Sequence, residues 1–148
     1  MTPQYRVLRW ICLILLKLRA RLYVEGREHI PAGPFIIVSN HVSNWDPIAL
    51  GVAFADRQVR ALGKQELFEL PILGRIAHWT GGIPIRRGEA DREAIAQCKA
   101  ALQAGEPLII LPEGTRSRTG ALNEGKMGIV FIAVGAGFYL ISSKKRLA

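Results

Sequence analysis

The chain of 148 residues is poor in cysteine, in aromatic residues and in acidic side chains. Its two cysteines, Cys12 and Cys98, stand far apart, so neither a disulfide framework nor a metal site is expected, and a reducing, cytosolic setting is favoured. Aromatic residues make up 7% of the sequence, and no zinc-ligand spacing or helix-turn-helix signature occurs. Nucleic acid is therefore not the expected partner.

The shortage of acidic side chains leaves a strong positive charge. Twenty Lys and Arg residues stand against twelve Asp and Glu residues, which gives a formal net charge of +8. Such a balance points to an anionic partner, which in general is nucleic acid, an anionic membrane or a phosphorylated substrate. Without nucleic-acid motifs, a membrane surface and a phosphorylated substrate are the two readings that stay open.

Residues 1–25 combine a short apolar run with basic flanks. The uncharged run from Trp10 to Leu16 has seven residues, whereas a membrane-spanning helix needs about 20. A secretory signal is disfavoured because basic residues continue after the run and no small-residue cleavage site follows. The pattern predicts an amphipathic helix over 5–24 that lies in the membrane interface, with Trp10 and leucines in the acyl boundary and arginines at the headgroups. A core-packed helix with basic edges is the alternative.

Short apolar runs alternate with helical patterns along the rest of the chain, which is typical of α/β architecture. The expected strands are 35–38, 59–62, 83–85 and 108–111, and the expected helices are 47–55, 66–78 and 90–104. We therefore predict an α/β layered domain over 26–148, with a central mixed sheet flanked by helices and preceded by the amphipathic N-terminal helix.

A histidine and an aspartate five residues apart, His41 and Asp46, follow the first expected strand. On one helix they would lie about 140° apart and would not meet. Asp46-Pro47 instead predicts a helix start, with Asp46 as N-cap, Pro47 as first helical residue and His41 in the turn before it. The carboxylate can then fix the imidazole tautomer, leaving the other nitrogen to take a proton from a substrate hydroxyl. Alternatively, His41 only satisfies backbone groups in a turn and Asp46 is an ordinary helix cap.

No nucleophile accompanies this pair, because no G-x-S-x-G elbow occurs and neither cysteine lies in a catalytic motif. The hydroxyl of the substrate would have to attack. A second apolar run, 108–111, breaks into Pro112-Glu113-Gly114-Thr115-Arg116-Ser117. Since ligands gather at the carboxyl ends of the strands in open α/β sheets, both polar loops could line one cleft.

Three motifs in this order resemble those of the glycerolipid acyltransferase family, in particular its bacterial 1-acyl-glycerol-3-phosphate acyltransferases. Asn40-His41 with Asp46 looks like the first motif, N-H-x-x-x-x-D, and 112–117 looks like the third, P-E-G-T-R-S. Between them, Gly81-Gly82-Ile83-Pro84-Ile85-Arg86-Arg87 is similar to the second, a glycine-led strand that closes on an arginine. The resemblance covers roughly 26–132.

The resemblance implies roles for the matching side chains. His41 would be the catalytic base and Asp46 its orienting carboxylate, while Arg87 and Arg116 would bind a phosphate through their planar guanidinium groups. The other predicted substrate-binding residues are Lys64, Glu113, Gly114 and Thr115. Each has a structural alternative: Arg86 and Arg87 as a solvated basic corner, Glu113 as an acceptor that holds its loop, Gly114 as a residue needed for its backbone conformation, Thr115 as a donor to its own turn, and Lys64 as a solvent-facing side chain.

The resemblance ends near the C-terminus. Family members continue past the third motif into a strand rich in valine and proline, and residues 129–142 do not match it. We therefore expect the acyltransferase domain 26–148 to be C-terminally incomplete, as a fragment, a premature stop or a shifted reading frame would make it.

The resemblance implies acyl transfer from acyl-CoA or acyl-carrier protein to the free hydroxyl of lysophosphatidic acid, which gives phosphatidic acid without a metal or a permanently bound cofactor. The implied partners are a membrane phospholipid surface, the thioester and the lysolipid, and the expected location is the cytoplasmic face of the inner membrane. One alternative is a truncated, inactive relative that binds anionic membrane or lipid phosphate. Another is a hydrolase that uses water as the acceptor.

Overall fold

The computed structural model describes residues 1–19, 22–54, 57–86, 91–125, 127 and 132. Its strands are β1 (Ile36–Val38), β2 (Arg60–Lys64), β3 (Ile83–Ile85) and β4 (Leu108–Ile110). Its helices are α1 (Pro3–Arg19), the 3₁₀ turn η1 (Arg27–His29), α2 (Asp46–Ala53), α3 (Gln65–Phe68), α4 (Leu73–Trp79) and α5 (Arg92–Gln103). This order confirms an α/β fold that begins with a helix.

The four strands form one parallel sheet in the order β1-β4-β2-β3. The expectation of a mixed sheet is therefore wrong for the described residues. Each strand is followed by helical chain that returns to the same end of the sheet before the next strand begins, so every strand runs the same way. The inner strand β4 is buried along its whole length, as parallel strands covered on both faces are.

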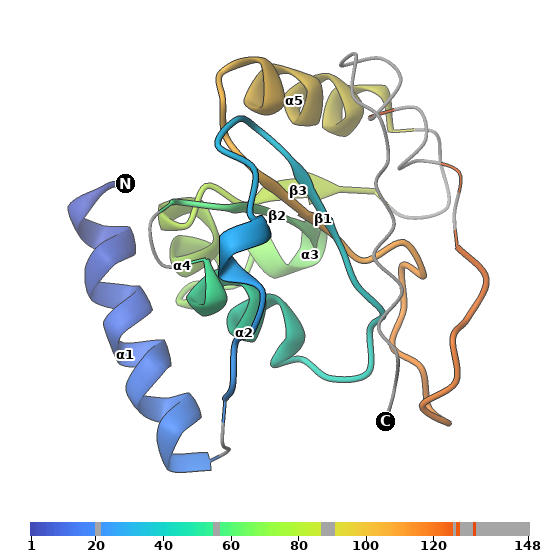
Figure 1. Ribbon diagram of the computed structural model, residues 1–148. Helices are drawn as coiled ribbons and strands as arrows, with labels where there is room; N and C mark the ends of the chain where they lie inside the picture. Colours follow the sequence, from blue (N-terminus) through green and yellow to red (C-terminus); the bar gives the residue numbers. More distant parts are fainter. Residues whose placement is uncertain (20–21, 55–56, 87–90, 126, 128–131, 133–148) are drawn as a thin grey trace.

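Helices cover both faces of the sheet (Figure 1). Helices α2, α3 and α4 lie on one side and α5 lies on the other. The connections β1 to β2 and β2 to β3 run in one direction across the sheet, and β3 to β4 runs back. Because parallel crossovers are right-handed, the reversal places α5 on the opposite face. All carboxyl ends of the strands meet at one edge, where the predicted site residues follow β1 and β4.

The expected helix 66–78 is broken into two short helices, α3 and α4. Pro71 lies between them, and proline cannot donate the hydrogen bond that a continuous helix needs. The two helices then pack tightly, since a Cβ atom placed on Gly74 would lie 2.2 Å from the carbonyl oxygen of Phe68. The prediction of one continuous helix is therefore wrong, and Pro71 explains the break.

The main core lies between the sheet and α5. Ile83, Cys98, Leu102 and Leu108 are fully buried there, and Ile95 packs against them. Burial raises the pKa of the Cys98 thiol to about 12, so this cysteine is a packing residue and not a nucleophile. The chain leaves α5 at Gly105, whose φ of 84° suits glycine at a helix end, as the sequence predicts.

Helix α1 packs through one side and exposes another. Tyr5 and Leu16 are buried, and Arg9 donates a hydrogen bond to the carbonyl oxygen of Val52 in α2 at 3.3 Å. On the other side Trp10 and Leu18 are 58% and 78% exposed. Within the described part of the chain, every helix is too short or too polar to cross a membrane.

Candidate active site

His41 and Asp46 meet at the carboxyl end of β1. The strand ends at Val38, His41 lies in the loop that follows, and α2 begins at Asp46. The His41 Nδ1 atom lies 3.0 Å from Asp46 Oδ2, and the two side chains are 13% and 20% exposed. A turn before α2 thus brings His41 and Asp46 together, as the sequence analysis predicts.

The carboxylate of Asp46 organises this turn instead of capping its own helix. The N-cap position of α2 belongs to Trp45, Asp46 is the first helical residue and Pro47 the second, so the predicted N-cap assignment is wrong by one residue. Asp46 Oδ2 accepts hydrogen bonds from the backbone N–H groups of Val42 at 2.8 Å and Ser43 at 2.7 Å. The same oxygen therefore holds both the backbone of the turn and the imidazole.

The charge state of Asp46 fixes the proton position on His41. Partial burial raises the pKa of Asp46, but the hydrogen bonds from Ser43, from the His41 ring and from Val42 outweigh it, and the pKa lies below its ordinary value. An ionised carboxylate can only accept, so Nδ1 carries the proton in the bond between them. The neutral ring then presents an unprotonated Nε2, which is the form that a general base requires.

The third-motif loop lies directly against this turn. Ser117 donates its backbone N–H to the carbonyl oxygen of His41 at 2.7 Å, and Ser39 donates to the carbonyl oxygen of Ile110 at 3.4 Å. Since β1 and β4 are paired neighbours, the two loops leave the same edge of the sheet side by side. The structure therefore brings the first and third motifs together.

Glu113 is buried in that loop, with 5% of its surface exposed. Its Oε1 atom accepts a hydrogen bond from the backbone N–H of His41 at 3.1 Å. Its Oε2 atom accepts from the backbone N–H of Asn123 at 3.3 Å and from Asn123 Nδ2 at 2.7 Å. Gly114 has a φ of 64°, a conformation that favours glycine, so its identity has a backbone reason.

The predicted phosphate ligands lie in different situations. Thr115 and Arg116 are exposed, and no ion pair of Arg116 occurs within the described part of the chain. Arg87 lies outside the described residues. Its neighbour Arg86 donates to Asp91 Oδ2 from its backbone N–H at 2.9 Å and from Nε at 3.4 Å.

Lys64 ends β2, two strands away from β1 in the sheet. Its ammonium group lies 2.8 Å from Glu66 Oε1, and half of its side chain is exposed. The structure joins His41, Asp46 and the Glu113–Gly114 loop through hydrogen bonds, and it gives Lys64 a partner on its own segment. The substrate contacts of these residues stay predictions.

Two residues with a place in this architecture were missed by the sequence analysis. Asp91 accepts a hydrogen bond from the backbone N–H of Ala94 at 3.1 Å and so caps α5, as well as holding Arg86. An aspartate just before a helical pattern is a recognised cap signal, and it was available in the sequence. Asn123 lies outside all three motifs, and no local pattern indicates its contact with Glu113.

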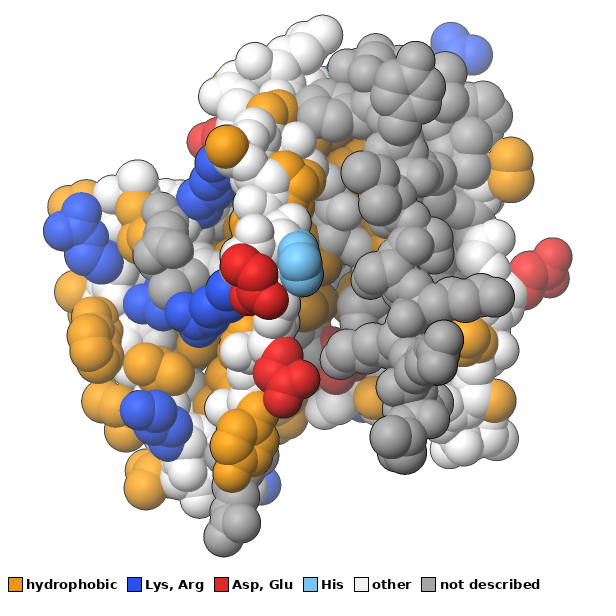
Figure 2. Space-filling view, viewed as in Figure 1, with side chains coloured by type: hydrophobic (Ala, Val, Ile, Leu, Met, Phe, Trp, Pro, Cys, Tyr) orange, Lys and Arg blue, Asp and Glu red, His pale blue; other side chains and the backbone are white. Residues whose placement is uncertain are grey.

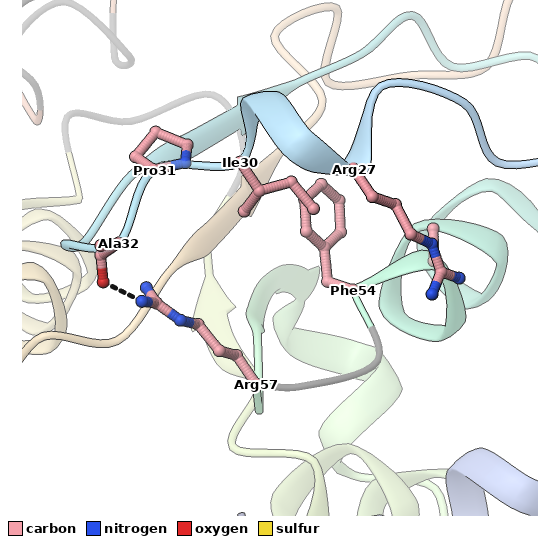
Figure 3. A pocket seen from close by; sticks show the side chains of 7 residues that line it. Arg27, Ile30, Pro31, Ala32, Phe54 and Arg57 are labelled. Atoms are coloured by element: carbon pink, nitrogen blue, oxygen red, sulfur yellow. Dashed lines mark hydrogen bonds between the residues drawn. The ribbon is translucent and has the colours of Figure 1, made fainter.

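A pocket of about 280 Å³ lies elsewhere, next to the chain that enters β1 and the chain that leaves α2. It is lined by Arg27, Ile30, Pro31, Ala32, Ala53, Phe54 and Arg57. His41 follows β1 and precedes α2, so the pocket lies at the other end of both elements. In Figure 3 the side chains of Arg27 and Arg57 extend in different directions, and Arg57 donates to the carbonyl oxygen of Ala32. The two guanidinium groups do not form a joint anion site.

The described residues contain no group of three or more His, Cys, Asp or Glu side chains placed to hold a metal ion. The structure brings together a histidine hydrogen-bonded to a carboxylate and a neighbouring loop that carries an exposed arginine.

The chain is similar to acyltransferases that act on lipids. A 1-acyl-sn-glycerol-3-phosphate acyltransferase of Bacillus subtilis is 31% identical over 123 residues, which are 78% of this chain and 61% of that protein. One of Pseudomonas aeruginosa is 32% identical over 120 residues, covering 79% and 46%. A lyso-ornithine lipid O-acyltransferase of Pseudomonas aeruginosa is 33% identical over 129 residues, covering 86% and 48%.

A solved structure is similar as well. The crystal structure of the 1-acyl-sn-glycerophosphate (LPA) acyltransferase PlsC from Thermotoga maritima matches with a TM-score of 0.75 at 30% identity, covering 90% of this chain and 54% of that one. The chain spans about one third to three fifths of the length of the curated relatives it matches. The model of the family described as Acyltransferase matches residues 21–143, which is most of the sequence, and the chain therefore belongs to the Acyltransferase family.

Proposed function

We propose that the protein transfers a fatty acyl group from acyl-CoA or acyl-carrier protein to the free hydroxyl of 1-acyl-glycerol-3-phosphate, which gives phosphatidic acid. The observation that carries the proposal is the 3.0 Å contact between His41 Nδ1 and Asp46 Oδ2 at the carboxyl end of β1. Relatives named as acyltransferases for this substrate, at about 30% identity, support the choice of acceptor.

The proposed reaction needs no enzyme nucleophile. His41 Nε2 removes the proton of the lysolipid hydroxyl while its oxygen attacks the thioester carbonyl carbon. The tetrahedral intermediate collapses as the carbon–sulfur bond breaks, and the proton held by His41 passes to the leaving thiolate. Asp46 stabilises the imidazolium that forms in between. General-base assistance of this kind is typically worth about 10² to 10⁴ in rate.

Phosphate binding is proposed for Arg116 and Arg87. Arg116 follows Glu113 by three residues in the loop that contacts His41, and its guanidinium is exposed, so it is available to a ligand at this edge. Arg87 enters the proposal through its motif alone. A phosphate gripped near the base would hold the reacting hydroxyl in place, and such positioning can contribute several kcal/mol.

Helix α1 is proposed to dock on an anionic membrane, with residues 1–25 lying in the interface. Figure 2 shows hydrophobic and basic side chains mixed on the surface over α1, at the left of the view. Val7, Ile14 and Leu18 are more than half exposed, and Lys17 and Arg19 lie in the last turn of the helix. Apolar area with basic flanks is the composition that binds anionic bilayers. The proposed location is the cytoplasmic face of the inner membrane.

A second acceptor deserves the same assay. The relative named lyso-ornithine lipid O-acyltransferase is 33% identical, no less similar than those named for the phosphate acceptor. A guanidinium group binds carboxylates as well as phosphates, so a contribution of Arg116 to acceptor binding fits either lysolipid. The choice between the acceptors therefore depends on which lysolipid is turned over with the higher kcat/KM.

The test uses the 148-residue chain with radiolabelled acyl-CoA, or labelled acyl-carrier protein, and each lysolipid in mixed vesicles. Labelled phosphatidic acid is expected, His41→Ala should abolish it, and vesicle binding by His41→Ala should stay that of the wild type. Free fatty acid as the sole product would mean a hydrolase, and vesicle binding without turnover would mean an inactive lipid-binding relative. Arg116→Ala should raise the apparent KM for lysophosphatidic acid more than the KM for the thioester. Equal effects on both would count against the phosphate assignment.

A further inference from the structure

The backbone of the proposed base is held from outside its own turn. The N–H of His41 donates to Glu113 Oε1 at 3.1 Å, and its carbonyl oxygen accepts from the Ser117 N–H at 2.7 Å. Its ring is held separately, by Asp46. When both backbone groups of a histidine and one of its ring nitrogens are held by hydrogen bonds, the direction of the other ring nitrogen is nearly fixed. The position of Nε2 therefore depends on the third-motif loop as well as on Asp46.

Both carboxylate oxygens of Glu113 accept hydrogen bonds from the protein. The side chain is buried, one carboxylate oxygen accepts from His41, and the other accepts twice from Asn123, at 3.3 and 2.7 Å. A carboxylate that accepts hydrogen bonds from several protein donors is well satisfied without a ligand. The amide Nδ2 of Asn123 makes the shortest of these contacts, so Asn123 fixes the far side of the same carboxylate.

We infer that Glu113 and Asn123 are a positioning pair that fixes the main chain of His41 and thereby aims Nε2 at the substrate hydroxyl, without touching the substrate themselves. Asn123 lies beyond the third motif. Glu113 is 72 residues from His41 in the sequence and 10 residues from Asn123. The kinetic part of this inference rests on the proposed acyl transfer, while the contact itself does not.

Substituting Glu113→Gln tests the pair with almost no change in size. Glutamine keeps one oxygen and replaces the other with an amide that can only donate. The amide must then face either the His41 N–H or the two Asn123 donors, so one side of the contact is lost. A displacement of about 1 Å at a reacting group can cost on the order of 10² in rate. We expect kcat to fall about 10- to 100-fold, with the KM values for acceptor and thioester within about twofold of the wild type.

Two further variants make the comparison specific. Asn123→Ala removes Nδ2 and leaves the backbone donor, so its kcat should fall less than that of Glu113→Gln, with the same unchanged KM values. Glu124→Gln makes the identical chemical change at an exposed neighbouring position and should behave as the wild type. A selective rise in the KM of one substrate in Glu113→Gln, with kcat kept, would overturn the inference in favour of direct substrate contact.

A readout without turnover separates this inference from the proposed function. Nitrogen-15 NMR of the His41 ring reports which nitrogen carries the proton, and amide hydrogen exchange reports the His41 N–H. The wild type should show the Nδ1–H form and a protected amide. Glu113→Gln should keep the Nδ1–H form, because Asp46 holds the ring, and should speed exchange of the His41 amide at least tenfold. Unchanged exchange would overturn the inference even in an active enzyme, and an inactive wild type would overturn only the proposed function. If Glu113→Gln does not fold, Asn123→Ala supplies the same two measurements.

Discussion

Substituting Asp46→Asn should separate the electrostatic role of this side chain from its structural role. Asp46 Oδ2 accepts hydrogen bonds from Val42, Ser43 and the His41 ring. The carbonyl oxygen of asparagine can occupy the same place and accept the same three donors, so the turn is expected to keep its shape. What disappears is the negative charge beside the imidazolium that forms during proton transfer.

The size of the loss follows from Coulomb's law. The bonded atoms are 3.0 Å apart, and charge centres about 4 Å apart at an effective dielectric constant of about 20 attract each other by about 4 kcal/mol. Solvent screens these partly exposed side chains, 13% and 20% exposed, and reduces the attraction to about 3 kcal/mol. Since about 1.4 kcal/mol is a tenfold change in rate, kcat should fall by about 10²-fold.

Initial rates at saturating acceptor and thioester measure this fall, and circular dichroism with urea unfolding checks that the fold is kept. Asp46→Ala is the matched comparison, because it removes the acceptor oxygen too and should lose stability by about 1 to 3 kcal/mol in addition to rate. If Asp46→Asn kept kcat within threefold of the wild type, the carboxylate would have no electrostatic part in catalysis, and the reasoning from its position would be refuted.

Three further predictions concern the fold. The Asp91 carboxylate accepts hydrogen bonds from the backbone N–H groups of Arg86 and Ala94, which lower its pKa to about 2. The lowered pKa contributes about 2 kcal/mol to the free energy of unfolding above pH 4, and this contribution is lost as pH falls through 2. Urea unfolding over this pH range should show the loss in the wild type and not in Asp91→Ala. Gly74→Ala should cost about 2 kcal/mol or more, because its Cβ would strike backbone, whereas Gly33→Ala, with open space, should be neutral or slightly stabilising by denaturant midpoint. Cys98 should resist a thiol reagent in the folded protein and react on unfolding, since burial raises its pKa to about 12; rapid labelling under native conditions would contradict its place in the core.

Those parts of the structure that depend on local chemistry could be read from the sequence. The four strands, the turn before α2 and the stop at Gly105 all follow from short patterns, and each lies within a few residues of its predicted place. The predicted meeting of the loops after β1 and β4 also holds, because both follow buried parallel strands at the same edge. The break at Pro71 carried a signal that was overlooked.

What could not be read from the sequence depends on residues far apart in it. The all-parallel sheet follows from the direction of every strand at once, and the mixed sheet was predicted without that information. The exchange of roles at Asp46, from helix cap to organiser of a turn, depends on where the His41 ring lies. The Glu113–Asn123 contact arises only when the chain beyond β4 returns to the loop after β1, and no spacing rule describes such a contact.

The strand order has a consequence for co-translational folding. Strands β1 and β2 come early in the chain, yet they are not neighbours, because β4 lies between them. A nascent chain that has released everything up to β3 can pair β2 with β3, but β1 cannot join this sheet until β4 has emerged. Until then His41 can contact Asp46 but not Glu113 or Ser117. The turn of His41 should therefore gain its hydrogen bonds from the loop of Glu113 and Ser117 only after β4 has paired with β1.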